Sequence, residues 1–256
     1  MRVSHSTEAI VLRAFPYGDS DKIVSFLTEN HGKISGIAKG AKRSRKRFAN
    51  SLEPFSVVEL RFQERQHSNL AFLLAADLRY AFKNLTANLQ AIAAASYLIE
   101  ITDRLIGEGD DSRQVFHHLK EGLGVLENIG YSVLFLTSFE LKLLKLAGYE
   151  PALNRCRQCA VDRPKDRPAD GWHFSPSDGG VFCYGCSKFQ HEILPVGSKA
   201  LAALADLQKE EQYTSGRISP SSSVVKEIRS LVLRFIQFQV GREIKSASFL
   251  NHVCMG

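Results

Sequence analysis

The sequence predicts an α+β multidomain protein: an N-terminal five-stranded β-barrel followed by an all-α helical domain with an inserted four-cysteine zinc hairpin. Three observations support this class. Short runs rich in Ile, Val and Phe fill the first part of the chain, apolar residues recur three and four apart from about residue 82, and two CxxC pairs interrupt that second pattern. The expected domains are a barrel at 1–80, a helical domain at 81–150 and 190–256, and a cysteine insertion at 151–189.

Five runs near the N-terminus have the composition of strands, and turn-favouring segments such as PYGDS and ENHG separate them. Apolar Val58 and Leu60 alternate with polar neighbours, so one face of that strand should be buried. On the same grounds Phe55, Phe62 and Phe72 are expected in the core. Five short strands predict a small closed barrel, either an OB-fold, which often binds nucleic acid, or an SH3-like barrel. The expected strands are 7–15, 21–29, 32–40, 55–64 and 69–78.

The spacing of apolar residues becomes helical after the barrel. Gly107, Gly130 and Gly148 stand where three helices should end. Pro220 and a run of serines precede a last long helix that Gly241 should close. The two later helices are expected to pack on the first three. The predicted helices are 88–106, 112–130, 131–148, 196–209 and 221–241.

Four of the five cysteines form two CxxC pairs, Cys156 with Cys159 and Cys183 with Cys186. Each CxxC turn points two thiolates at one ion, and two such turns complete a tetrahedral site, which predicts one structural Zn²⁺. The intervening WHFSPSDGGVF should form a hairpin that returns the second pair to the first. Because four sulfur ligands leave no position for an activated water, the metal should maintain the fold and take no part in chemistry.

Two further residues with metal-binding side chains, one in this segment and one near the C-terminus, are expected to stay outside the site. His173 lies in the same segment, but four thiolates already fill the coordination sphere. Cys254 has no partner in the sequence and is expected to be a free thiol. A redox pair or incidental buried cysteines are the alternatives, although a redox CxxC usually connects a strand to a helix in a βαβ unit.

Composition and missing motifs narrow the functional class. The chain has 256 residues, a net charge of +6 and 44% hydrophobic residues, which is ordinary for a globular protein. Its apolar stretches fall short of the roughly 20 residues of a membrane span, and no secretory signal is evident, so a soluble cytoplasmic protein without a membrane partner is expected. The sequence contains no G-x-x-x-x-G-K-[ST], HExxH or GxSxG motif, which argues against an ATPase and against an enzyme in general.

The segment GIAKGAKRSRKRFAN is strongly basic and contains no acidic residue. Such a run can be a disordered tail, a targeting address, a membrane-surface patch or a nucleic-acid contact. Its glycine and serine spacing does not provide the amphipathic helix that a membrane patch needs, and its place between the third and fourth strands favours contact with phosphates. The candidate DNA-binding residues are Lys39, Lys42, Arg43, Arg45, Lys46 and Arg47, with Phe48 as a base-stacking candidate.

Residues 16–62 strongly resemble the N-terminal domain of the RecO family of bacterial DNA-repair proteins. The resemblance rests on Tyr17-Gly18-Asp19, on the AKGA motif and on the LEPF that follows the basic run, and it continues in AGYEPALNRCRQC, GGVFCYGC and GREIKSASFL. It implies an OB-fold that binds single- and double-stranded DNA and anneals complementary strands without ATP. It also implies cooperation with RecR, with the single-stranded-DNA-binding protein and, indirectly, with the recombinase RecA, in a bacterial cytoplasm and at the nucleoid.

A possible partner site lies near the C-terminus. A basic rim around an apolar helix suits an acidic peptide that ends in a hydrophobic residue, such as the C-terminal tail of the single-stranded-DNA-binding protein, although a solvated helix face is the alternative. The candidate residues are Arg229, Arg234, Arg242 and Lys245. For the whole chain, the alternative functions are a zinc-ribbon factor of transcription or RNA metabolism and a metal-dependent nucleic-acid enzyme.

Overall fold

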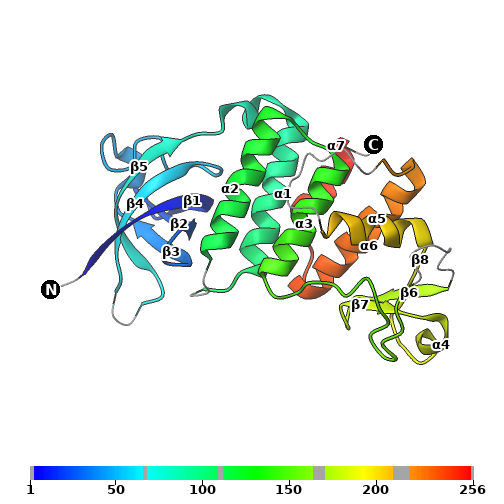
Figure 1. Ribbon diagram of the computed structural model, residues 1–256. Coiled ribbons are helices and arrows are strands. Elements are labelled where there is room, and N and C mark those ends of the chain that lie inside the picture. Colours follow the sequence, from blue (N-terminus) through cyan, green and yellow to red (C-terminus); the bar gives the residue numbers. More distant parts are fainter. Residues whose placement is uncertain (1–2, 66–67, 109–111, 164–170, 210–218, 255–256) are drawn as a thin grey trace. The chain divides into compact units, whose positions relative to one another are not determined.

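The computed structural model describes residues 3–65, 68–108, 112–163, 171–209 and 219–254, which fall into two compact units (Figure 1). The first unit contains Met1–Gly130 together with Lys245–Gly256, and the second contains Tyr131–Ile244. The barrel therefore shares a unit with helices, and the cysteine segment lies in the other. The domain boundaries expected from the sequence stay a prediction.

Five strands of the first unit close into a barrel: β1 (Ser4–Tyr17), β2 (Asp21–Thr28), β3 (Lys33–Ala38), β4 (Val57–Gln63) and β5 (Ala71–Tyr80). Their order is β1-β2-β3-β5-β4, and β3 pairs with β5 in parallel while the other pairs are antiparallel. The first half of the long β1 pairs with β4 and the second half with β2, which allows one strand to close the barrel. The predicted fold class is confirmed, with a closed barrel of the OB type.

The barrel core depends on a glycine where β3 meets β5. Gly36 pairs with Ala71, and a Cβ atom on Gly36 would lie only 2.4 Å from Cδ2 of Leu73. Any larger residue would force that leucine out of the interior. A bulge between Val11 and Arg13 shifts the register of β1, so Arg13 lies on the outer surface of the barrel.

The described part of the first unit also contains the α-helices α1 (Leu89–Leu105), α2 (Arg113–Asn128) and α7 (Lys245–Cys254). Asn88 caps α1, because its side chain accepts hydrogen bonds from the backbone N–H groups of Gln90 and Ala91. Glu100 of α1 accepts hydrogen bonds from the backbone N–H groups of Lys245 and Ser246, where α7 begins. The predicted helices 88–106 and 112–130 correspond to α1 and α2, whereas α7 was not predicted from the sequence.

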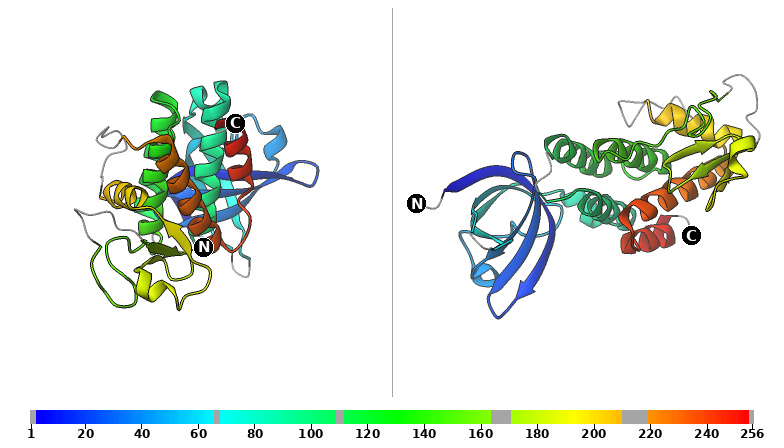
Figure 2. Two further views of the ribbon diagram at one scale, coloured as in Figure 1. Left: turned by 90° about the vertical axis from the view of Figure 1, so that its right-hand side faces the viewer. Right: turned by 90° about the horizontal axis from the view of Figure 1, so that it is seen from below.

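The second unit combines helices with a small sheet, visible in two further orientations (Figure 2). The sheet has the order β7-β6-β8, and the ring of Phe174 in its central strand lies 5.3 Å from the ring of Phe235 in α6. Among the parts of the chain that the structure describes, every helix is too short or too polar to cross a bilayer. The elements are α3 (Val133–Leu146), β6 (Trp172–Ser175), β7 (Gly180–Phe182), α4 (Tyr184–Ser187), β8 (Leu194–Val196), α5 (Ser198–Leu207) and α6 (Ser222–Val240).

Candidate nucleic-acid interface and metal centre

The four cysteines that the sequence singles out converge in the second unit. The sulfur atoms of Cys156, Cys159, Cys183 and Cys186 all lie within 4.8 Å of one another, and those of Cys159 and Cys183 are 3.7 Å apart. A tetrahedral ion with Zn–S bonds of about 2.3 Å requires sulfur atoms about 3.8 Å apart. Both the donor atoms and their spacing therefore fit one tetrahedral metal ion.

Backbone pairing brings the two cysteine turns together. Val181 of β7 donates its N–H to the carbonyl oxygen of Ala152 at 3.0 Å, and the N–H of Arg157 donates to the carbonyl oxygen of Val181 at 2.9 Å. The segment that carries the first CxxC therefore lies along β7, which leads directly into the second. Gly180 permits this approach, since a Cβ atom there would lie 2.7 Å from Cγ of Arg157. The predicted hairpin is present as β6 and β7.

The four thiols cannot all ionise without a compensating charge. Burial acts to raise the pKa of Cys156, but backbone N–H groups of Cys159, Cys183 and Gln158 donate to its sulfur and lower the pKa to about 6. Burial and the three neighbouring thiols raise the pKa of Cys186 to about 12. A bound cation would reverse this second effect, because it stabilises all four thiolates together.

The two other candidate ligands lie elsewhere. His173 is in β6, and its Nδ1 atom lies 3.1 Å from the carbonyl oxygen of Gly171, outside the cysteine cluster. Cys254 is in α7 of the first unit, where burial raises the pKa of its thiol. Both residues are therefore separate from the candidate metal centre, as the sequence suggested.

The basic run forms the connection between β3 and β4, and its first residues are bonded to the β1–β2 hairpin. Lys42 Nζ donates to the carbonyl oxygen of Gly18 at 2.7 Å, and the N–H of Gly40 donates to Oδ1 of Asp21 at 2.8 Å. Lys39 Nζ lies 2.8 Å from Oδ2 of the same carboxylate. These contacts place the basic loop beside the β1–β2 loop, one of the loops with which OB-folds bind nucleic acid.

All six basic side chains of this loop are exposed. Arg43, Arg45 and Lys46 have side chains with no hydrogen bond or ion pair to any residue that the structure describes. Arg47 Nη2 donates to the carbonyl oxygen of Lys39 at 2.8 Å. The loop therefore presents at least three uncompensated positive charges next to the hairpin.

The structure corrects the expectation for three phenylalanines, of which Phe55 is only half-buried, precedes β4 and lies outside the barrel core. Phe48 is only 4% exposed and packs in the barrel core, so it is not available to stack on a base. The reason is tertiary: the loop turns back over one end of the barrel, and the N–H of Ala76 donates to the carbonyl oxygen of Arg47. Phe72, which was expected in the core, is half-buried on the outer face instead.

Other exposed aromatic residues were missed by sequence reasoning. Phe15 and Tyr17 on β1 are 53% and 52% exposed. They are two residues apart, and this spacing places both side chains on one face of a strand. The sequence prediction ends the strand at residue 15 and assigns Tyr17 to the turn PYGDS, whereas β1 continues to Tyr17, so the shared face of the two rings was not recognised.

The expected basic rim near the C-terminus is also corrected. Arg229 is 3% exposed and forms a buried ion pair with Glu140, so it does not face a partner. Arg234 and Arg242 are exposed in the second unit, whereas Lys245 is exposed in the first. The structure therefore does not assemble these four residues into one surface of one unit.

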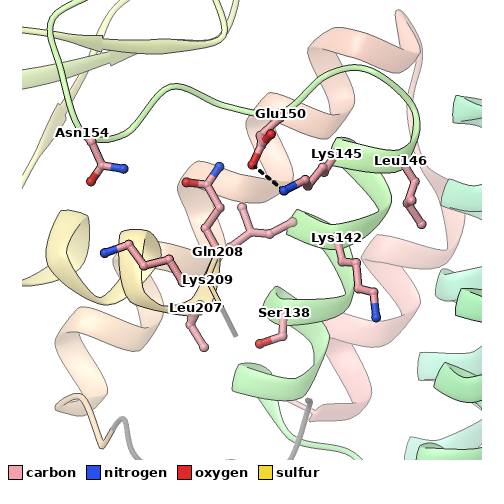
Figure 3. A pocket seen from close by; sticks show the side chains of 10 residues that line it. Ser138, Lys142, Lys145, Leu146, Glu150, Asn154, Leu207, Gln208 and Lys209 are labelled. Atoms are coloured by element: carbon pink, nitrogen blue, oxygen red, sulfur yellow. Dashed lines mark ion pairs between the residues drawn. The ribbon is translucent and has the colours of Figure 1, made fainter. Parts of the chain in front are cut away.

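A groove in the second unit offers a different basic surface (Figure 3). It has a volume of about 810 Å³ and is lined by Lys142 and Lys145 of α3 and by Lys209, which follows α5. Leucines form its apolar part, and the only carboxylate among the lining residues is that of Glu150, 3.5 Å from Lys145 Nζ. Sequence reasoning missed this groove because its sides are more than 50 positions apart in the chain. The remaining lining residues are Ser138, Leu141, Leu146, Asn154, Leu207 and Gln208.

Comparison with known proteins gives a consistent result over nearly the whole chain. Residues 1–82 match the family model described as "Recombination protein O N terminal", and residues 86–248 match "Recombination protein O C terminal". The chain is 35% identical to the DNA repair protein RecO of Syntrophus aciditrophicus over 98% of this chain and 97% of that protein. It is 34% identical to the protein of the same name from Syntrophotalea carbinolica, over 98% and 95%. The corresponding protein of Anaeromyxobacter dehalogenans is 32% identical over 95% and 94%.

Proposed function

The chain belongs to the RecO family of DNA repair proteins, and we propose that it is a recombination mediator that binds single- and double-stranded DNA through its barrel. The observation that carries this proposal is the exposed basic loop, which Asp21 and Lys42 hold against the β1–β2 hairpin. Its cations neutralise phosphates and release counterions, which favours either form of DNA. The same neutralisation reduces the repulsion between two strands and so promotes their annealing.

Annealing needs no chemical step, and the protein acts without ATP and without catalysis. Together with RecR it helps to load RecA on single strands that are covered by the single-stranded-DNA-binding protein. Because its substrate is chromosomal DNA, it acts in the bacterial cytoplasm at the nucleoid. The metal is one Zn²⁺ held by the four cysteines, where it fixes the two turns and contributes to folding free energy.

The acidic C-terminal tail of the single-stranded-DNA-binding protein has two candidate sites in the second unit. The lysine-lined groove suits an acidic peptide with a terminal hydrophobic residue, because three lysines and three leucines are among its lining residues. The exposed Arg234 and Arg242 remain from the rim proposed from the sequence. The groove is the stronger candidate, since a concave apolar surface can bury the last side chain of the tail.

An annealing assay tests the mediator function. Two complementary strands, one with a fluorophore and one with a quencher, are first coated with the single-stranded-DNA-binding protein, and the purified chain is added without nucleotide. We expect pairing to accelerate in proportion to protein concentration, with the DNA strands chemically unchanged. A chain that leaves the pairing rate unchanged would refute the mediator role, and cleaved or modified strands would show an enzyme instead.

A further inference from the structure

Four apolar side chains form one row across four strands of the barrel. Phe15 on β1 pairs directly with Ile23 on β2, Ile23 pairs with Ile37 on β3, and Ile37 pairs with Phe72 on β5. Directly paired residues of neighbouring strands point to the same side of a sheet. The row therefore runs perpendicular to the strands and has an aromatic residue at each end.

This row lies on the outer face of the barrel. The next residues along the strands, Val24 and Ala71, belong to the barrel core, as does Leu73, which a Cβ atom on Gly36 would meet. Because successive side chains of a strand point to opposite faces, the residues of the row point outwards. Within the row Ile37 is buried, at 6% exposure, and Ile23 is half-buried, so the apolar surface that reaches solvent lies at the β1 end.

The end of the row on β1 is open to solvent. Phe15 is about half exposed, and so is Tyr17, which lies two residues further along the same face. The guanidinium carbon of Arg13 lies 5.9 Å from the centre of the Phe15 ring, on the side away from Tyr17 in the strand. At the other end of the row Phe72 is half-buried. The row thus presents aromatic faces that the protein itself leaves partly uncovered.

The exposed aromatics lie beside the basic loop. Tyr17 pairs in register with Asp21, and Asp21 binds both the N–H of Gly40 and the ammonium group of Lys39. The ring of Tyr17 and the start of the basic loop at Lys39 and Gly40 therefore meet at the same Asp21. A single strand of DNA offers matching groups, because its phosphates are charged and its unpaired bases expose their faces.

We propose that Phe15 and Tyr17 stack on unpaired bases and make the barrel prefer single-stranded over duplex DNA. The inference rests on the proposed DNA-binding function and identifies the residues that distinguish single-stranded from duplex DNA. In a duplex each base is already stacked and its faces are out of reach, so the row gains nothing there. Cations of the basic loop act on both forms of DNA.

The two contributions are separable by their dependence on salt. Phosphate contacts give a slope in a plot of log affinity against log salt concentration, because each contact releases counterions. Stacking of a ring on a base adds affinity without adding such a contact. Loss of stacking should therefore lower the affinity for single strands at every salt concentration while the slope is retained.

The test compares the full-length parent with the Phe15→Ala/Tyr17→Ala variant by fluorescence anisotropy. The probes are a labelled oligothymidylate and a labelled duplex of the same length, each titrated at several salt concentrations. Alanine at a stacking position costs roughly five- to 150-fold in affinity, so we expect the affinity for the single strand to fall at least about tenfold. Affinity for the duplex should stay within about twofold of the parent, since no stacking is lost there.

The control is Leu78→Ala. Like Phe15 and Tyr17, Leu78 is an exposed apolar residue of the barrel, but it lies in β5 and is absent from the row. It should leave both affinities unchanged. Equal losses on both probes, or no loss on either, would overturn the inference while the DNA-binding function stands. A parent chain that binds neither probe would refute the DNA-binding function itself, and the inference with it.

A second variant avoids any dependence on folding of the double alanine variant. Phe15→Trp keeps an aromatic ring and adds a fluorophore on the row, whereas Trp172 of the parent lies buried in the second unit. Saturating oligothymidylate should quench the emission of the added tryptophan by stacking, and saturating duplex should not. Equal emission changes with both probes, or none with the single strand, would contradict the inference.

Discussion

Glu140 of α3 and Arg229 of α6 form an ion pair that is buried inside the second unit. Removing one partner leaves the other charge buried without its counterion, which typically costs about 3–5 kcal/mol. We expect Arg229→Met to lower the free energy of unfolding by that amount. The Glu140→Leu/Arg229→Met double variant should recover most of the loss, because an apolar pair needs no counterion. Urea unfolding gives the free energy of unfolding of each variant, and a double variant as unstable as the single one would contradict this account.

The elements that the sequence predicts correctly are those determined by local pattern. Each expected strand of the barrel is present, because a composition rich in Ile, Val and Phe between turn-forming segments is a local property of the sequence. The cysteine site is predictable for a similar reason, since a CxxC turn fixes two ligands over four residues. In contrast, α7 begins where Glu100 accepts the N–H groups of residues 245 and 246, about 145 positions away. No local pattern contains that interaction.

The predictions for two site residues were wrong for the same physical reason, which is that tertiary contacts decide burial. Phe48 and Arg229 have the composition expected of a DNA-binding loop and a basic rim, but their burial is decided by segments distant in the chain. The return of the loop over the barrel end covers Phe48, and Glu140 of another helix compensates Arg229. Phe15 and Tyr17 are not identified from the sequence, because the predicted strand ends at residue 15 and β1 extends to Tyr17. Their exposure depends on which face of β1 the rest of the unit covers, and the bulge after Val11 determines that face.

Loss of a cysteine ligand should destabilise the second unit. Cys156→Ser and Cys183→Ser each remove one of four sulfur donors, and metal coordination contributes folding free energy. We expect less than one bound zinc ion per chain by elemental analysis and a lower melting temperature, with nearly normal DNA binding by the folded fraction. Cys254→Ser is the matched control, because this thiol is outside the cluster and its loss should change neither quantity. Parent protein free of metal, with variants that melt at the same temperature, would refute the structural role.

The groove between α3 and the end of α5 should bind the acidic tail peptide. Lys142→Ala/Lys209→Ala removes two of the three lining lysines, one from each side. Because partly exposed charge pairs each contribute a modest amount, we expect peptide affinity to fall about three- to tenfold in calorimetric titrations. The control Arg234→Ala/Arg242→Ala removes the same charge from exposed positions of the same unit. If only the control variant loses peptide affinity, the tail binds at Arg234 and Arg242 and not in the groove.

The anchor of the basic loop should respond to acid. The N–H of Gly40 and the ammonium group of Lys39 lower the pKa of Asp21 from 3.8 to about 2. A carboxyl group with a lowered pKa in the folded state stabilises the fold above its unfolded pKa, and this contribution is lost as pH falls from about 4 towards 2. Asp21→Asn has no such titration, so its stability deficit relative to the parent should shrink over that range. Urea unfolding at several pH values measures the deficit, and a constant deficit would disprove the anchor.

The salt dependence of DNA binding should come largely from the basic loop. If four or five of its residues meet phosphates, the log–log slope on single strands should be about −3 to −3.5. Replacing Lys42, Arg43, Lys46 and Arg47 by alanine should flatten the slope by about two to three units, equally for all DNA sequences.

Lys42 and Arg47 also hydrogen-bond to the backbone, so a second variant tests the same point without disturbing the loop. Arg43→Ala/Arg45→Ala/Lys46→Ala removes only side chains that have no partner among the residues described by the structure, and it should flatten the slope by about two units. Arg61→Ala/Arg79→Ala is the control, because these barrel arginines are already paired with Asp77 and Glu59. Anisotropy titrations at several salt concentrations give each slope. If both loop variants keep the slope and affinity of the parent, the basic run is a solvated surface and the DNA-binding site lies elsewhere.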